Sequence, residues 1–321
     1  EPQQLALLAL QSRVLMADQR YNEALPLLNE LVTRAPDSLY ARALLGETYL
    51  KLGETKDARR QLQIVLEKQT YYVPALILMV GVELQSGQYE QALEYAEQIQ
   101  KARPELYMGY ELAGDAGMAS KDYTEAKAAY AKARELEPSA TLAIKLAEAA
   151  KRSGNSEEAS AALLAWLNDH PDDARPRQFL GTTYQDMGQN DKAIEAYEKV
   201  LALQPDNLVA LNNLAWLYSL GNNPKALELA EKAYQINPEN PGIQDTYGWI
   251  LVQQGQVDQG RRLLKQAMEK LSEVPEVRYH YAVALLKSGN KAEAHKIFNQ
   301  LLQSERPFEG RKDIQDILGT Q

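Results

Sequence analysis

The stretch LVALNNLAWLYSLGNNPKALELAEKAYQINPENPGIQDTYGWILVQQG, residues 208–255, decides the fold of this chain. It predicts two helices joined by a short turn, followed by the first helix of another such pair. Ala215 and Trp216 return as Gly248 and Trp249 at the same phase of the next pair. The rest of the chain varies this pattern, so the sequence predicts a repeat protein.

Three series of residues recur with a fixed period along the chain. Prolines are spaced by 33 or 34 residues, or by twice 34, at Pro36, Pro104, Pro138, Pro171, Pro205 and Pro238. Small residues precede them at Ala24, Ala58, Ala92, Ala126, Ala159, Ala193, Ala226, Gly260 and Ala294. An earlier, mostly small series is Ser12, Gly46, Val80, Gly114, Ala147, Gly181, Ala215, Gly248 and Ala282. This regularity indicates one structural unit repeated along the whole chain.

The small residues predict where the first helix of a repeat (helix A) touches the second (helix B). In residues 174–207 we expect Leu180, Tyr184, Tyr197 and Val200 to pack around that contact. The proline ends helix B, because it has no N–H and restricts the residue before it. In the turn after helix A, left-handed glycines are expected at Gly53, Gly87, Gly154, Gly188, Gly221, Gly255 and Gly289.

The stretch FLGTTYQDMGQNDKAIEAYEKVLALQP, Phe179–Pro205, resembles the tetratricopeptide repeat, with its L-G-x-x-Y, G, A, Y and P positions. The resemblance covers nearly the whole chain. It implies an all-α fold, a right-handed superhelical solenoid of about nine helix–turn–helix repeats that forms one domain over residues 1–321. The expected repeats are 5–38, 39–72, 73–106, 107–139, 140–173, 174–207, 208–240, 241–274 and 275–308, with a C-terminal capping helix in 309–321.

The composition excludes several classes of function. A net charge of −9 and a pI near 5.1 argue against a nucleic-acid partner, which requires a basic surface. No apolar run is long enough for a transmembrane segment. The absence of cysteine excludes disulfides and thiolate metal sites, and no cofactor is expected.

The two ends of the chain differ in character. The chain begins at Glu1 without methionine, which suggests a processed or excised protein. The apolar segment LALLALQSRVLM, residues 5–16, is either an irregular first helix or a helix once covered by preceding repeats. At the other end, Arg311–Leu318 places Ile314, Ile317 and Leu318 on one face, as in a capping helix.

Function in a solenoid of this kind is expected on the concave surface formed by the A helices. The first four repeats supply apolar residues with a few acids, and they either receive a hydrophobic segment or pack against one another. The fifth repeat is charged there, through Lys145, Glu148, Lys151 and Arg152.

Repeats six to nine place aromatic rings beside amides and carboxylates. Trp216 and Trp249 share one phase, so we expect them side by side, either as a contact surface or as packing between repeats. The residues predicted to bind a partner are Arg175, Gln178, Thr182, Asn212, Asn213, Trp216, Asp245, Thr246, Trp249, Tyr279 and His280.

Two specific activities are not supported by the residues. The carboxylate clamp of co-chaperones with this repeat needs lysines and an arginine, but Gln178, Thr182, Asn213, Gly242 and Thr246 stand in its place. The histidines His170, His280 and His295 have no metal-ligand spacing, and no catalytic motif is present. The sequence therefore predicts a binding protein without catalytic activity.

The partner is predicted to be a protein or peptide segment, and a polysaccharide is the alternative ligand of the aromatic groove. The paired N-N-x-A-W and D-T-x-G-W repeats resemble those of bacterial lipoproteins that accompany exosortase and exopolysaccharide export systems. This resemblance implies a bacterial periplasmic or outer-membrane-associated protein. A cytosolic assembly or regulatory scaffold that binds peptides is the alternative.

Overall fold

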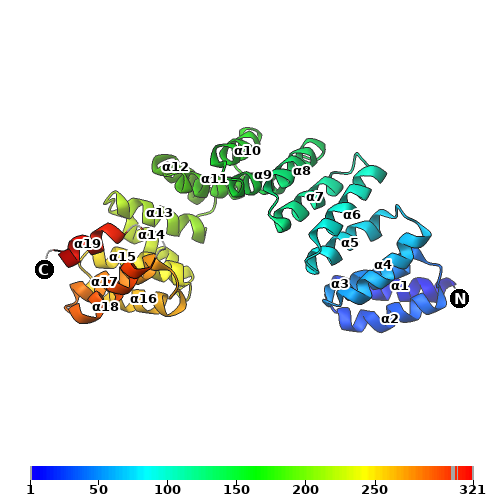
Figure 1. Ribbon diagram of the computed structural model, residues 1–321, viewed down its shortest axis with the longest axis horizontal. Helices are drawn as coiled ribbons and strands as arrows, with labels where there is room; N and C mark the ends of the chain where they lie inside the picture. Colours follow the sequence, from blue (N-terminus) through cyan, green and yellow to red (C-terminus); the bar gives the residue numbers. More distant parts are fainter. Residues whose placement is uncertain (1, 305–307, 309, 320–321) are drawn as a thin grey trace. The chain divides into compact units, whose positions relative to one another are not determined.

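The computed structural model describes residues 2–304, 308 and 310–319, and over these residues it contains nineteen α-helices and no strand (Figure 1). Contacts between Cα atoms divide the chain into an N-terminal unit, Glu1–Asp169, and a C-terminal unit, His170–Gln321. Within each unit, consecutive helices pack in pairs, which confirms the all-α helix–turn–helix fold. The single domain over residues 1–321 stays a prediction.

The N-terminal unit consists of five helix pairs. Its helices are α1 (Pro2–Ala17), α2 (Tyr21–Arg34), α3 (Leu39–Lys51), α4 (Thr55–Lys68), α5 (Val73–Gln85), α6 (Tyr89–Ala102), α7 (Tyr107–Ser120), α8 (Tyr123–Leu136), α9 (Ala140–Arg152) and α10 (Ser156–Asp169).

The C-terminal unit consists of four helix pairs and one further helix. Its helices are α11 (Ala174–Asp186), α12 (Asn190–Leu203), α13 (Leu208–Leu220), α14 (Lys225–Ile236), α15 (Pro241–Gln253), α16 (Val257–Lys270), α17 (Pro275–Lys287), α18 (Lys291–Gln303) and α19 (Arg311–Gly319).

The ends of the B helices follow the proline series. Each B helix that precedes a proline of the series ends two residues before it, as α12 does at Leu203 before Pro205. However, α4 and α16 end at the same phase, two residues before Thr70 and Ser272. In both, the next backbone N–H still bonds to the last turn of the helix, as in the repeats with proline. Proline therefore marks this boundary but is not required for it.

One predicted turn glycine is wrong. The other six glycines of the series have positive φ, but Gly221 has a φ of −90°. The adjacent Asn222 takes the left-handed conformation instead, with a φ of 53°. Asparagine tolerates this region better than most residues, because its short amide can bond locally.

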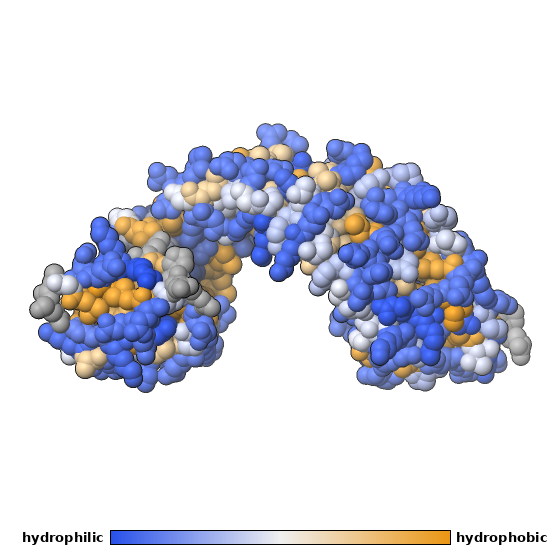
Figure 2. Space-filling model, in the orientation of Figure 1, coloured by the Kyte–Doolittle hydropathy of each residue, from blue (hydrophilic) through white to orange (hydrophobic). Residues whose placement is uncertain are grey.

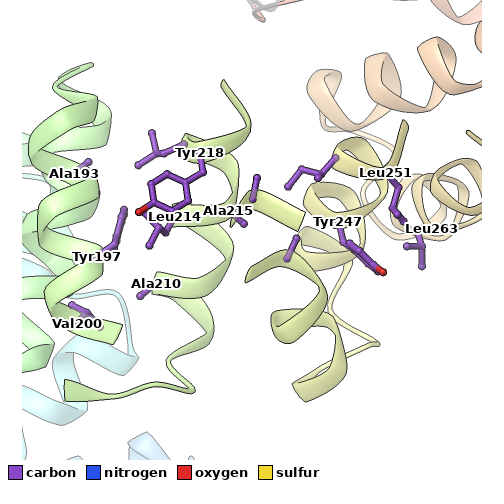
Figure 3. Close-up of a cluster of buried hydrophobic side chains, with 14 residues drawn as sticks. Ala193, Tyr197, Val200, Ala210, Leu214, Ala215, Tyr218, Tyr247, Leu251 and Leu263 are labelled. Carbon is purple, nitrogen blue, oxygen red and sulfur yellow. The ribbon is translucent and has the colours of Figure 1, made fainter. Parts of the chain in front are cut away.

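Small residues hold the helix pairs together as predicted. A Cβ on Gly181 would lie 2.7 Å from the ring of Tyr197, so the ring of helix B rests directly on the backbone of helix A. Ala193, Tyr197 and Val200 are fully buried, and they continue into the apolar cluster shown in Figure 3. In the N-terminal unit, Gly114 meets Tyr130 in the same way.

The two ends of the chain differ in how their apolar residues are covered. In α1, Leu5 and Leu8 pack against the first core cluster, whereas Leu7, Leu10 and Val14 are more than half exposed. In α19, Ile314 is fully buried and Ile317 and Leu318 pack beside it, as expected for a capping helix. Positions 309, 320 and 321 of the predicted cap lie outside the described residues.

Hydrophilic residues cover most of the face drawn in Figure 2, and apolar residues show there only in patches. Over the part of the chain that the structure describes, no helix has the length and apolar character needed to cross a bilayer.

Candidate functional site

Four A helices and the start of the last helix form a pocket of about 400 Å³ in the C-terminal unit. This volume lies within the range of natural ligand sites. The lining residues are Gln185 from α11, Asn212, Asn213, Trp216 and Leu220 from α13, Asp245, Thr246, Trp249 and Gln253 from α15, Glu276, Tyr279 and His280 from α17, then Gly310 and Asp313.

Helix periodicity and capping aim these side chains at one place. Asn212 and Trp216 lie four residues apart, as do Asp245 and Trp249, so each pair shares one face of its helix. The side chain of Asn240 accepts hydrogen bonds from the backbone N–H groups at the start of α15, and Asn207 does the same for α13. These caps fix where each A helix begins, and thus which face it presents.

A buried acid–histidine pair forms the base of the pocket. Nδ1 of His280 lies 3.0 and 2.9 Å from the two carboxylate oxygens of Asp245. His280 is 5% exposed and Asp245 is 9% exposed. Because Nδ1 must carry a proton to bond to a carboxylate, this contact fixes the orientation of the ring.

Both predicted tryptophans contact His280. The ring of Trp249 stacks on His280 with centroids 4.3 Å apart, and the ring of Trp216 lies 5.6 Å from it at a tilt. Part of each indole is exposed, so neither is sealed inside the protein. The two tryptophans therefore serve as packing between repeats and as walls of an open pocket at once.

The C-terminal cap completes one side of the pocket through Tyr279. Its hydroxyl donates to Asp313 Oδ2 over 2.9 Å, and the ring contacts Trp249 and Phe308. Burial and then this hydrogen bond raise the pKa of Tyr279. A Cβ on Gly310 would lie 2.6 Å from the same ring, so only glycine allows this approach.

A polar network supports the opposite side. Asn213 donates to the hydroxyl of Tyr197 over 3.0 Å, and that hydroxyl donates to Gln185 over 3.2 Å. Thr182 Oγ1 lies 3.1 Å from the same hydroxyl. These bonds hold the amides of Asn213 and Gln185 at fixed positions on the wall of the pocket.

The predicted contact residues divide into two groups. Those that the structure brings together around the pocket are Asn212, Asn213, Trp216, Asp245, Thr246, Trp249, Tyr279 and His280. The other three, Arg175, Gln178 and Thr182, lie on α11 but do not line the pocket. Arg175 is exposed, while Gln178 accepts from Asn207 over 2.9 Å. Contact of any of these residues with a partner stays a prediction.

Some lining residues were missing from the predicted set. Glu276 is the second residue of its repeat, the same position as the predicted Arg175, and Leu220 lies four residues after Trp216 on the same face of α13. The periodic pattern alone was therefore enough to include both. Asp313 reaches the pocket only because the cap folds back on Tyr279, and no periodic signal marks that contact.

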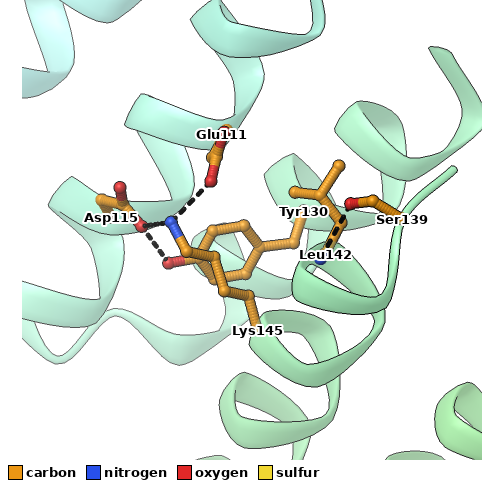
Figure 4. A network of polar contacts seen from close by, with 6 residues as sticks. All are labelled: Glu111, Asp115, Tyr130, Ser139, Leu142 and Lys145. Carbon is orange, nitrogen blue, oxygen red and sulfur yellow. Dashed lines mark hydrogen bonds and ion pairs between the residues drawn. The ribbon is translucent and has the colours of Figure 1, made fainter. Parts of the chain in front are cut away.

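In the N-terminal unit, Lys145 of the charged fifth repeat forms ion pairs with carboxylates of the preceding repeat (Figure 4). Lys145 Nζ lies 2.7 Å from both Glu111 and Asp115, and Tyr130 donates to Asp115 over 2.7 Å. Burial lowers the pKa of Lys145, but the hydrogen bonds to Asp115 and Glu111 outweigh burial and raise it. Arg152 pairs with Glu148 over 2.8 Å.

The predicted apolar groove of the first repeats is largely packed inside the N-terminal unit. Ile77, Leu84 and Leu112 pack against the buried cluster of α5–α8, while Tyr40 stays exposed. In the described part of the chain, no three acidic or histidine side chains are arranged to hold a metal ion. The C-terminal pocket is therefore the strongest candidate for a binding site.

Comparisons with known proteins agree with this fold. Three family models, each described as a tetratricopeptide repeat, together match more than half of the chain, at residues 15–71, 82–141, 117–181, 180–239, 217–271 and 251–309. A tetratricopeptide repeat-containing protein of Pseudomonas aeruginosa is 27% identical over 146 residues, which are 43% of this chain and 24% of that protein. The chain thus matches about a quarter of the length of that relative.

Two solved structures are similar in fold. The Cut9–Hcn1 hetero-tetramer of the APC/C aligns over 87% of this chain and 55% of its own, with a TM-score of 0.54 and 13% identity. A tetratricopeptide repeat protein from Parabacteroides merdae aligns over 66% and 87%, with a TM-score of 0.55 and 18% identity.

Proposed function

Because this chain belongs to the tetratricopeptide repeat family, we propose that it is a non-catalytic scaffold that binds a segment of a partner protein in the pocket of its C-terminal unit. Proteins of this family are built from stacked helix pairs whose A helices are free to present side chains. The site residues expected to make the contact are those that line the pocket, with Trp216 and Trp249 as its main apolar surface.

The observation that carries this proposal is the partial exposure of two indoles over a rigid polar base. The ring of Trp249 is held by His280, which in turn is held by Asp245. Aromatic rings fixed in this way contribute large contact area at little entropic cost, which is typical of binding hot spots.

Selection of peptides from a random display library tests the proposal. Peptides enriched on the wild-type chain are expected to lose binding by at least about tenfold on a Trp216→Ala/Trp249→Ala variant. Trp166→Phe is the matched control, because it removes an indole from the N-terminal unit, and it should leave binding unchanged. If the selected peptides bind the double variant as well as the wild type, the pocket is not the binding site.

A polysaccharide ligand is the second candidate, favoured by the amides of Asn212, Asn213 and Gln185 beside the aromatic walls. Sugar rings stack on indoles while their hydroxyls bond to amides. Titration with neutral oligosaccharides, followed by tryptophan fluorescence, distinguishes it. A saturable change that is lost in Trp216→Ala would favour this second candidate over a protein partner.

For the cellular setting, we propose assembly of a bacterial envelope, exopolysaccharide export or secretion system, in the periplasm or at the outer membrane. The paired tryptophan repeats support it through their resemblance to export lipoproteins. A cytosolic peptide-binding scaffold is the alternative. Fractionation of cells that express the full reading frame decides between them, since recovery only with cytosolic markers would refute an envelope location.

A further inference from the structure

The described lining of the pocket in the C-terminal unit carries three acids, and His280 is its only basic side chain. Asp245, Glu276 and Asp313 contribute carboxylates, and no lysine or arginine occurs among the described lining residues. The carboxylate of Asp245 is hydrogen-bonded to His280. Glu276 has no hydrogen bond or ion pair with the described chain, and Asp313 accepts a hydrogen bond from Tyr279 at Oδ2 alone. Two carboxylates at the rim thus retain free acceptor positions.

Three aromatic residues, Trp216, Trp249 and Tyr279, line the same pocket, and both tryptophans keep part of their surface exposed. The face of an aromatic ring carries partial negative charge and attracts cations, tryptophan most strongly. The aromatic rings and the carboxylates therefore both favour a positively charged ligand.

A further feature favours a ligand rich in donors. Oδ1 of Asn212 is buried and has no hydrogen-bond partner in the described structure, although this residue lines the pocket. Leaving such an acceptor unpaired costs about 1–3 kcal/mol. Oδ1 is shielded from solvent, so a donor from a ligand offsets this cost when the amide of Asn212 turns towards the pocket.

We propose that this pocket receives an arginine side chain of the partner segment, with the guanidinium against the indole faces and its N–H groups donated to Glu276 and Asp313. This inference rests on the proposed function, because it names the chemistry of the partner at the same pocket. A guanidinium is planar, permanently charged and carries five donors and no acceptor, whereas an ammonium is compact and strongly hydrated. Flat aromatic walls with carboxylates at the rim fit the guanidinium better.

The test uses the complete chain labelled with 5-fluorotryptophan and observed by fluorine NMR. The three signals are assigned by replacing Trp166, Trp216 and Trp249 with phenylalanine one at a time. N-acetyl-arginine N-methylamide is titrated in the millimolar range and compared with its neutral, nearly isosteric citrulline counterpart. We expect saturable shifts of Trp216 and Trp249 but not of Trp166, with arginine about tenfold tighter than citrulline.

Charge variants locate the effect. Glu276→Gln/Asp313→Asn should weaken the arginine probe about tenfold and leave the citrulline probe unchanged. Asp258→Asn/Glu269→Gln is the matched control, since it removes the same charge from α16, outside the pocket lining, and should have little effect. Circular dichroism of both variants verifies that the helices remain intact.

The outcomes separate this inference from the proposed function. Equal binding of arginine and citrulline, or an unchanged affinity in the Glu276→Gln/Asp313→Asn variant, overturns the arginine assignment while the pocket remains a peptide site. The absence of any shift with the arginine probe also overturns it, and the display selection then decides the proposed function independently. Tighter binding of a glucosamine oligosaccharide than of the arginine probe would favour a cationic sugar and overturn the arginine assignment, while the display selection still decides whether a protein partner binds.

Discussion

The two units use the same positions of the repeat for opposite purposes. In the N-terminal unit, Lys145 is the sixth residue of its repeat and bonds to the fifth and ninth residues of the preceding repeat, Glu111 and Asp115. In the C-terminal unit, His280 is also sixth, and it contacts the fifth and ninth residues before it, Asp245 and Trp249. Helix A thus reaches the neighbouring helix A through one recurrent geometry.

The chemistry at these positions decides whether the space is filled or open. The long side chain of Lys145 forms ion pairs with two carboxylates and lies over the ring of Tyr130. The charges at this position are therefore paired within the protein. The flat imidazole of His280 takes up one carboxylate and one ring face, and the space above it becomes the pocket. The same spacing along the repeat therefore gives a closed joint in one unit and an open pocket in the other.

Removal of the imidazole is expected to have the largest effect. His280→Ala leaves the carboxylate of Asp245 buried without its partner and should lower the free energy of unfolding by about 3 kcal/mol. Urea unfolding followed by hydrogen exchange of α15 and α17 measures it. In the Asp245→Asn/His280→Ala variant no carboxylate is left buried, so part of the loss should return. A single variant as stable as the wild type would show that the pair does not hold the base of the pocket.

Replacement of Gly260 by alanine is expected to have the next largest effect on stability. The corresponding position carries Ala126 and Ala193 in other repeats, but a Cβ on Gly260 would lie 2.5 Å from the carbonyl oxygen of Gly248. Gly260→Ala should therefore push α15 and α16 apart and cost about 2 kcal/mol in thermal unfolding. Gly221→Ala is the control, since its nearest neighbour is 3.8 Å away, and equal losses in both variants would contradict this packing argument.

Replacement of Lys145 tests the closed joint. Lys145→Met keeps the apolar stem but leaves Glu111 and Asp115 facing each other, and it should cost about 1–2 kcal/mol in urea unfolding. The cost is smaller than for His280 because these side chains are 20–31% exposed and water can reach them. Hydrogen exchange should localise the change to α7 and α9, and a change confined to α13–α17 would refute the assignment.

Alkaline pH is expected to produce the smallest effect. Burial and then donation to Glu198 raise the pKa of Tyr218 to about 12. Above pH 10 the unfolded chain loses this proton while the folded chain keeps it, so stability falls as the pH rises from 10 towards 12, by about 1 kcal/mol at pH 11. Tyr218→Phe should make the loss of stability between pH 9 and pH 11 shallower. An unchanged pH dependence would show that this hydroxyl titrates normally when folded.

The fold was predictable because its causes are local and repeat. Small residues such as Gly181 and Ala193 act within one helix pair, and almost every repeat carries a small residue at both positions. Periodicity also brought Trp216 and Trp249 together correctly, since equal phases on stacked helices lie near each other.

The site was less predictable because it depends on which tertiary contacts the side chains form. Asp245 and His280 were each expected in the groove, but their direct bond depends on the distance between two helices. Asp313 was missed because the approach of the cap depends on a single glycine, Gly310, outside the periodic pattern. Thr182 is the ninth residue of its repeat, as Trp216 and Trp249 are of theirs. However, its hydroxyl lies 3.1 Å from that of Tyr197, and it does not line the pocket.

The contact between Gly310 and Tyr279 makes the last helix part of the wall of the pocket. The helix α19 has only nine residues and packs mainly against α18 and Tyr279, and elements with few packing contacts open most readily. A ligand that needs this wall must wait for α19 to dock, and its dissociation rate would then follow the opening of that helix. We therefore expect the docking of α19 to set how long a partner would remain bound in this pocket.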